Sequence, residues 1–352
     1  MGSEMCIRDS LESSSTTSIY RGFSIMIYQD FSTSQQDVRL SELSERDGIW
    51  DKYRTQSLVI ELIYRKEREF YKLSKRIENC SCYLEFKLNL EGNLVLKKAN
   101  FCRSRYCYVC MWRKSLYNRA ILYRACERIE PQYSNHRFIF LTLTVKNCHV
   151  GQLRTMLSNM NESWRRLIKR KQFVDVVVGW VRSTEVTRDS KYVNTHAHPH
   201  FHSMLLVKPS YFSRKYIKQE QWAKIWQECL RVDYVPVVDV RSVRGKRVND
   251  DAVKLAIIET LKYSVKQADI NVDVDDQQSR EWFYTLTRET RKLRFVACGG
   301  VFKDAIKSDE EIDNENLVQI NNTDEIEQTS KRLIFEFCRE KRFYRFDPDL
   351  SR

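Results

Sequence analysis

The sequence predicts an α+β protein in which an antiparallel sheet is covered by helices, with a small cysteine-rich module on its N-terminal side. The main observation is a strand–helix–strand–strand–helix–strand–helix order between residues 138 and 267, which favours antiparallel pairing over a doubly wound parallel sheet. Closely spaced cysteines between residues 80 and 110 mark the separate module. The hydrophobic fraction of 42% is ordinary for a globular protein, and 352 residues suffice for two or three compact units.

The N-terminal region is expected to divide into two parts. Residues 1–45 should be a disordered tail, because the Ser- and Thr-rich run at residues 13–18 offers nothing to bury. Residues 46–79 should be helical, since apolar residues recur there at helical spacing among many charges. The chain has no apolar stretch of membrane-spanning length and no signal-peptide pattern, so we expect a cytoplasmic protein with no membrane partner.

Residues 80–130 are expected to hold a structural zinc site and a basic helix. Two short β-like runs flank a Gly92–Asn93 turn, and three cysteines follow at Cys-x4-Cys-x2-Cys spacing. Eleven cysteines without a secretory signal favour thiolate metal ligation over disulfides. The expected tetrahedral Zn²⁺ ligands are Cys80, Cys102, Cys107 and Cys110. Cys82 is the alternative to Cys80, because strand alternation would place both on one face.

The chain is basic, and part of its positive charge lies beside these cysteines. Sixty Lys and Arg against 47 Asp and Glu give a net charge of +13, and residues 103–128 are strongly basic. Such a surface suits a polyanion, because bound phosphates release condensed counterions. The side chains expected to contact DNA in this module are Arg103, Arg105, Arg113 and Lys114.

The remaining elements follow from hydrophobic periodicity. The expected strands are residues 138–145, 174–186, 200–207 and 235–243. The expected helices are residues 112–129, 151–170, 219–231 and 250–267. Asn249 or Asp250 is the expected N-cap of the last helix.

Four of the six histidines fall within one seven-residue run, which makes this run the first candidate site. His200 and His202 share one face of the expected strand, and two imidazoles on a rigid strand form half of a site for a divalent metal. Pro199 cannot donate to a central ladder. The regular strand is therefore expected to start after Pro199, which leaves His196 in a loop and His198 outside the ladder.

A carboxylate should complete this metal site. A divalent ion that polarises a phosphate favours an acidic ligand beside its imidazoles. Glu185 ends the strand that precedes the histidine strand, and the polar turn between them would bring it beside His200 or His202. Asp175 and Asp189 are the alternatives.

A nucleophile is the second requirement of a phosphoryl-transfer site. Glu259 and Tyr263 lie four residues apart, so on a continuous helix they share a face. A carboxylate beside a phenol suits nucleophilic chemistry, in which the attacking oxygen needs a positioned proton acceptor. With 18 tyrosines in the chain, this spacing also occurs by chance.

Taken in order, these motifs resemble the rolling-circle replication initiators of the HUH endonuclease superfamily, in the bacterial plasmid Rep group with an upstream zinc module. Residues 140–144 (Phe-Leu-Thr-Leu-Thr) are similar to the first family motif, and residues 198–202 (His-Pro-His-Phe-His) to the second. Glu259-x3-Tyr263, with Lys262 before the tyrosine, is similar to the third.

The resemblance extends over about residues 80–304. The cysteine block at residues 100–113 is similar to the group's upstream signature, although Tyr108 stands where the family has proline after the cysteine. The resemblance implies a nuclease domain over residues 131–305 with a ferredoxin- or RRM-like palm. Residues 306–352 fall outside it and are expected to be an acidic tail with a terminal helix or strand.

The resemblance also implies a reaction. Tyr263 would attack a phosphodiester of single-stranded DNA and form a 5′-phosphotyrosine link, while a free 3′-hydroxyl is left for a polymerase. Mg²⁺ or Mn²⁺ would act at His200, His202 and Glu185, and Glu259 would activate water at termination. The remaining implied site residues are Lys262 and Lys266, which would neutralise phosphate charge. Tyr284 and Tyr234 are the next candidates for the nucleophile.

The implied partners are single-stranded or supercoiled origin DNA, a host helicase and a polymerase, with a homodimer as a further possibility. Three other readings stay open at this point. They are a relaxase or single-strand transposase with the same chemistry, a non-catalytic zinc-containing DNA-binding regulator, and a metal-dependent hydrolase without a covalent step.

Overall fold

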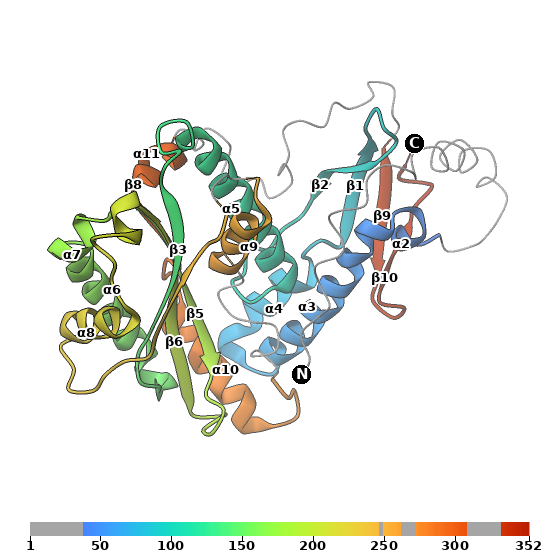
Figure 1. Ribbon diagram of the computed structural model, residues 1–352. Coiled ribbons are helices and arrows are strands. Elements are labelled where there is room, and N and C mark those ends of the chain that lie inside the picture. Colours follow the sequence, from blue (N-terminus) through green and yellow to red (C-terminus); the bar gives the residue numbers. More distant parts are fainter. Residues whose placement is uncertain (1–37, 246–248, 262–271, 308–331, 352) are drawn as a thin grey trace. The chain divides into compact units, whose positions relative to one another are not determined.

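A computed structural model describes residues 38–245, 249–261, 272–307 and 332–351 (Figure 1). The chain divides into two compact units. The first unit comprises residues 1–60, 75–109 and 321–352, and the second comprises residues 61–74 and 110–320. Within the described ranges, no helix combines the length and the apolar character needed to cross a membrane.

The first unit contains a four-stranded antiparallel sheet of order β10-β9-β1-β2. Its strands are β1 (Tyr83–Leu88), β2 (Leu94–Ala99), β9 (Leu333–Cys338) and β10 (Phe343–Phe346). The hairpin β1–β2 turns near Gly92, whose φ of +83° suits a residue without a Cβ. Strands β9 and β10 come from the range expected to be an acidic tail with a terminal helix or strand, and the rings of Phe86 and Phe335 pack edge to face across β1 and β9. The C-terminal strands therefore complete the sheet that the hairpin begins.

Several helices precede this sheet along the chain. They are α2 (Leu40–Leu43), η1 (Glu45–Gly48), α3 (Ile49–Arg65), η2 (Arg68–Phe70) and α4 (Tyr71–Glu78). Helices over residues 46–79 were predicted, whereas α2 falls within the range expected to be disordered. Trp50 of α3 is buried and packs against Phe101 and Tyr344, so aromatic contacts hold α3 to the sheet.

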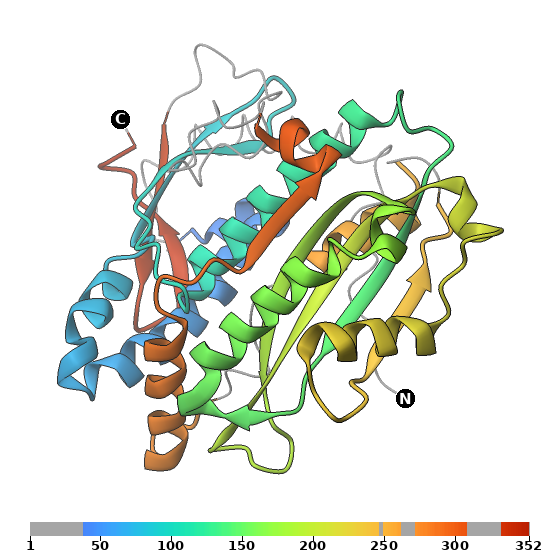
Figure 2. The same ribbon diagram turned by 90° about the vertical axis from the view of Figure 1, so that its left-hand side faces the viewer.

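The second unit is built on a six-stranded antiparallel sheet of order β7-β3-β6-β5-β8, with β4 also paired to β6. The strands are β3 (Arg137–Thr144), β4 (Cys148–His149), β5 (Val177–Arg188), β6 (His196–Val207), β7 (Val238–Ser242) and β8 (Val296–Gly300). The edge strands β7 (gold) and β8 (orange-red) lie on opposite sides of the sheet in Figure 2. The prediction of an antiparallel α+β architecture is thus confirmed.

Helices cover both faces of this sheet. On one face pack α6 (Leu153–Leu167) and α8 (Gln219–Leu230), and on the other pack α5 (Tyr108–Ile129) and α9 (Asp251–Thr260) (Figure 1). The α9 face holds a core in which Val181 and Met204 of the sheet meet Leu122 and Ile257 of the helices. The remaining elements are η3 (Val150–Gln152), α7 (Lys171–Val174), η4 (Pro209–Phe212), α10 (Gln277–Thr290) and α11 (Val301–Lys307).

The histidine strand differs from the sequence prediction. Strand β6 begins at His196 and runs straight through Pro199. Pro199 pairs with Val186 on one side, but on the other side β3 ends opposite His200 and β4 starts pairing only at Ala197. The proline therefore stands at a gap between two neighbouring strands, where its missing N–H breaks no ladder.

Some element ends also differ, and the strand predicted for residues 235–243 is limited to β7. The strand predicted from residue 174 begins at Val177, because residues 171–174 form α7. Helix α9, predicted for residues 250–267, has Asp250 at its N-cap position and is described only to Thr260, with Leu261 leaving helical geometry at φ −108°. Residues 262–271, which include Lys262, Tyr263 and Lys266, lie outside the described residues.

Candidate metal centre

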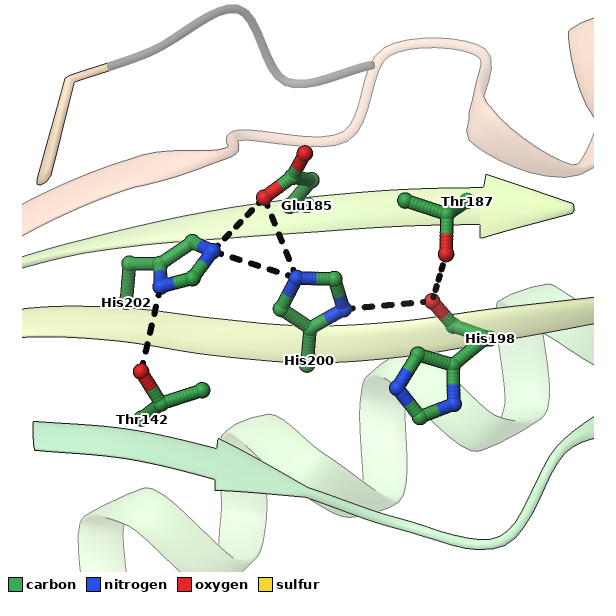
Figure 3. Close-up of polar contacts among 6 residues, drawn as sticks. All are labelled: Thr142, Glu185, Thr187, His198, His200 and His202. Atoms are coloured by element: carbon green, nitrogen blue, oxygen red, sulfur yellow. Dashed lines mark hydrogen bonds and ion pairs between the residues drawn. The ribbon is translucent and has the colours of Figure 1, made fainter. Parts of the chain in front are cut away.

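Three side chains from two paired strands meet on the α9 face of the sheet (Figure 3). Glu185 of β5 stands directly opposite His200 of β6, and Ser183 stands opposite His202. Glu185 Oε2 lies 3.0 Å from His200 Nε2 and 2.6 Å from His202 Nε2. The two Nε2 atoms are 3.1 Å apart. Strand alternation thus places both imidazoles on one face of β6, beside the carboxylate of Glu185. The sequence predicted this placement of the three side chains.

The site is largely shielded from solvent. Glu185 is 1% exposed and His200 is 8% exposed. Burial alone would raise the pKa of Glu185, but hydrogen bonds and charge from His200 and His202 outweigh it and hold the pKa well below its ordinary value. The carboxyl group is therefore an anion at neutral pH, as a metal ligand must be.

A second layer of contacts orients both rings. His202 Nδ1 lies 3.3 Å from the Thr142 hydroxyl on β3. His200 Nδ1 lies 3.3 Å from the carbonyl oxygen of His198, which also accepts a long hydrogen bond from Thr187. When Nδ1 is engaged in this way, Nε2 is left to face the carboxylate (Figure 3).

The donor set fits a divalent cation. The three ligand atoms lie within 4.8 Å of one another, and Glu185 Oε1 is buried without a hydrogen-bond partner. The two ring nitrogens and the carboxylate oxygen lie close enough to direct their lone pairs at one ion. Two imidazoles and one carboxylate suit several divalent metals, so the donor set alone does not select the ion.

The other histidines and acids of this region lie outside the group. His198 faces the side-chain oxygen of Asn147, and desolvation together with the charge of His200 lowers its pKa. His196 pairs with His149 of β4. Asp175 forms an ion pair with Lys215, and Asp189 accepts hydrogen bonds from backbone N–H groups in the β5–β6 turn. Neither alternative acid joins the metal donors.

The predicted nucleophile cannot be placed, because Tyr263 lies outside the described residues. Glu259 is half-buried near the end of α9, the helix that packs on the metal face of the sheet. Tyr284 is a poor substitute, since it is 2% exposed and donates to the Ile63 carbonyl at 2.7 Å. Desolvation raises the pKa of Tyr284 further. Tyr234, the other alternative, is half-buried, and its hydroxyl accepts the N–H of Lys146.

The second candidate site is a cluster of four buried cysteines. Its members, Cys80, Cys102, Cys107 and Cys110, bring their Sγ atoms within 4.8 Å of one another. Backbone N–H groups approach the sulfurs of Cys80 and Cys102 at 3.4 Å. Four thiolates in such a group fit a tetrahedral zinc ion.

Cys82 is exposed and lies apart from the cluster, beside Asn100. The expectation that Cys80 and Cys82 share a strand face was wrong, because β1 starts only at Tyr83. Ser81, between the two cysteines, has a φ of +47°, which turns the chain there.

The basic side chains beside the cysteines differ in exposure. Arg103 and Lys114 are exposed and Arg105 is half-buried. Arg113 is buried at 8% exposure, with its guanidinium group over the Trp112 ring. Of these four, Arg113 is therefore the least accessible to a DNA backbone.

Thr142 contacts one of the candidate metal ligands, and the sequence analysis did not single it out. It is the central threonine of the run at residues 140–144, and its register partner across β3 and β6 is His202. Both threonines of the run lie opposite a histidine, and only the side-chain contacts show that Thr142 is the one whose hydroxyl faces a ring nitrogen.

Comparison with known proteins identifies a matching family. Residues 93–345 match the Rep_1 family, described as replication proteins. A Protein rep of Streptococcus pneumoniae serotype 2 is 34% identical over 304 residues, covering 84% of this chain and 91% of the relative. A Protein rep of Bacillus amyloliquefaciens is 36% identical over 255 residues, 67% of this chain and 73% of the relative.

A Protein rep of Lactiplantibacillus plantarum is 34% identical over 264 residues, 72% of this chain and 81% of the relative. No solved structure matches the chain significantly. Since the family match covers well over half of its length, the chain belongs to the Rep_1 family of plasmid replication proteins, the rolling-circle Rep group.

Proposed function

We propose that this protein is a metal-dependent, sequence-specific DNA nickase that starts rolling-circle replication by cutting and joining one strand at the plasmid origin. In this proposal the second unit is an HUH nuclease with a ferredoxin- or RRM-like palm. The observation that carries the proposal is the Glu185–His200–His202 group, held on one face of paired strands in a replication protein.

The proposed nucleophile is the phenolic oxygen of Tyr263. It attacks the phosphorus of the scissile phosphodiester, forms a P–O bond to the tyrosine and breaks the bond to the 3′-oxygen. The products are a 5′-phosphotyrosine link and a 3′-hydroxyl, which takes up a proton. Because a free phenol has a pKa of about 10, it is mostly protonated at neutral pH and needs a nearby proton acceptor.

His200, His202 and Glu185 are proposed to hold Mg²⁺ or Mn²⁺. When bound, the ion supplies Lewis-acid polarisation of the phosphate oxygens and stabilises charge on the leaving oxygen. The protein's part is to fix the ligands before DNA arrives, which it does through the β5–β6 pairing and the contacts at each Nδ1 atom. Lys262 and Lys266 are proposed to neutralise phosphate charge.

The cysteine cluster is proposed to hold a structural Zn²⁺ ion. The ligands would come from the turn after α4 (Cys80), from the loop after β2 (Cys102) and from around the start of α5 (Cys107 and Cys110). Arg103, Arg105 and Lys114 are proposed to contact DNA from this region. The proposed partners are origin DNA, a host helicase and a polymerase, and the protein is proposed to form a homodimer.

A covalent adduct assay tests the proposal. The full chain is mixed with labelled single-stranded origin DNA and Mn²⁺, and the products are separated on a denaturing gel. A shifted band that survives denaturation is expected, and it should vanish in Tyr263→Phe. Tyr216→Phe, at a tyrosine that is 55% exposed, is the matched control and should keep the band.

Other outcomes would redirect the assignment. Cleavage without a shifted band would indicate a hydrolase that uses water directly. Binding without cleavage in the presence of Mn²⁺ would indicate a non-catalytic regulator. A shifted band that persists in Tyr263→Phe would move the nucleophile to another tyrosine.

A further inference from the structure

A row of four residues runs across the sheet from the metal site to its edge. Glu185 is opposite His200, and His200 is opposite Thr144. Thr144 in turn is opposite Val237, because the Thr144 N–H donates to the Val237 carbonyl and continues the β3–β7 register. Directly opposed residues share a sheet face, so Val237 extends the metal face. Two strand spacings place it about 10 Å from His200.

This end of the row is unusually apolar for a surface. Val237 is 73% exposed and Val235 is 70% exposed, the highest values among the large hydrophobic side chains of the described residues. Single exposed valines are common, but two at alternate positions beside a candidate site call for an explanation. The segment is not loose, since the Thr144 hydroxyl also donates to the Val237 carbonyl at 2.8 Å.

A cation and an aromatic ring flank the two valines. The Lys146 Nζ atom lies 4.2 Å from the centre of the Tyr234 ring, and the Lys146 N–H donates to the Tyr234 hydroxyl at 3.1 Å. These contacts fix the ammonium group at the end of β3, beyond Thr144. Apolar surface, an aromatic ring and a fixed positive charge thus lie together beside the metal face.

That combination matches the chemistry of single-stranded DNA. Proteins bind such strands with cations that follow the phosphates and with aromatic or apolar side chains against the bases. A double helix would offer its phosphates but not its base faces. A basic chain, at +13, favours a polyanion over an apolar protein segment at this edge.

We propose that Lys146, Tyr234, Val235 and Val237, here called the β7 strip, bind the single-stranded DNA segment next to the bond that is cut. Lys146 contacts a phosphate, while the valines and the tyrosine ring contact bases. The inference rests on the proposed function, which it deepens by locating one path of the DNA strand towards the metal site.

The test measures DNA binding without any cutting. Fluorescence anisotropy follows the full chain as it binds an oligothymidylate of about 15 nucleotides in buffer without Mg²⁺ or Mn²⁺, at several salt concentrations. The double variant Val235→Ser and Val237→Ser should bind roughly tenfold more weakly, with an unchanged salt dependence. Lys146→Ala should bind more weakly at low salt and lower the slope of log affinity against log salt by about 0.7.

Matched controls come from the far end of β5, in α7. Lys171→Ala and Val174→Ser change the same residue types at exposed positions and should bind as wild type does. Since binding is measured without the divalent ion that cutting would need, failure of nicking leaves this test intact. Wild-type affinity and slope in both strip variants would overturn the inference. So would a strip variant that changes only the sedimentation of the protein, because the strip would then be an interface between copies.

Discussion

Glu185 and His200 are directly opposed in the β5–β6 ladder, and their Oε2 and Nε2 atoms lie 3.0 Å apart. Backbone hydrogen bonds on both strands fix the two Cα positions, so little conformational freedom remains to be lost when a cation binds. A site on paired strands is also held more accurately than one on loops. The metal site should therefore form before DNA binds.

Removing the charge of Glu185 should weaken metal binding in the absence of DNA. Glu185→Gln keeps the size of the side chain but offers a neutral oxygen or an amide to the cation. We expect Mn²⁺ affinity to fall by at least about tenfold, as measured by electron paramagnetic resonance of free Mn²⁺. Asp175→Asn, at an acid paired with Lys215 outside the group, should leave the affinity unchanged. Equal affinity in Glu185→Gln and wild type would remove Glu185 from the site.

The Thr142 hydroxyl should strengthen metal binding through its contact with His202. Thr142→Val keeps the shape of the side chain but leaves His202 Nδ1 without its hydroxyl partner, so Mn²⁺ should bind about tenfold more weakly. Thr142→Ser restores the hydroxyl and should restore binding. Thr144→Val is the control on the same strand face, because that hydroxyl donates to the Val237 carbonyl and not to a histidine. If Ser and Val at position 142 behave alike, the hydroxyl has no such role.

The placement of His200 and His202 on one strand face was predictable, because backbone geometry fixes the alternation of side chains along a strand. His200 and His202 had to share a face, and a short turn had to bring Glu185 near them. The start of the strand was not predictable. A proline is excluded from a central strand only if its missing N–H would face a neighbouring strand, and this depends on where both neighbours begin and end. The sequence does not show that β3 stops at Thr144 and β4 begins at Cys148.

Long-range pairing accounts for the other differences. Strand β9 pairs with β1 although more than two hundred residues separate them, so no local pattern links Phe335 to Leu84. Strand β8 was missed because it ends in two glycines, which usually weaken a strand. Here Gly299 lies against Trp180, where an added Cβ would stand 2.5 Å from the indole ring. The nucleophile remains a prediction, since Tyr263 lies outside the described residues.

Zinc content should show whether Cys80 or Cys82 is the fourth zinc ligand. Cys80→Ser removes one of the four clustered thiolates, and the full chain should then lose its zinc and melt at a lower temperature. Cys82→Ser changes an exposed thiol outside the cluster and should keep both the zinc and the melting temperature. Atomic absorption on the purified proteins and thermal unfolding provide the measurements. Full zinc content in Cys80→Ser would return the choice of the fourth ligand to Cys82.

Glu259 should act at the end of a replication round and not at its start. Glu259→Gln keeps a hydrogen-bonding side chain but cannot accept a proton from water, so Tyr263 should still nick while the second cleavage fails to release free protein. The fraction of protein left covalently on DNA after one round should rise relative to wild type. Asp251→Asn, at the first residue of the same helix, is the matched control. An equal loss of nicking and release in Glu259→Gln would instead make Glu259 part of both steps, with its carboxylate serving the tyrosine as well as water.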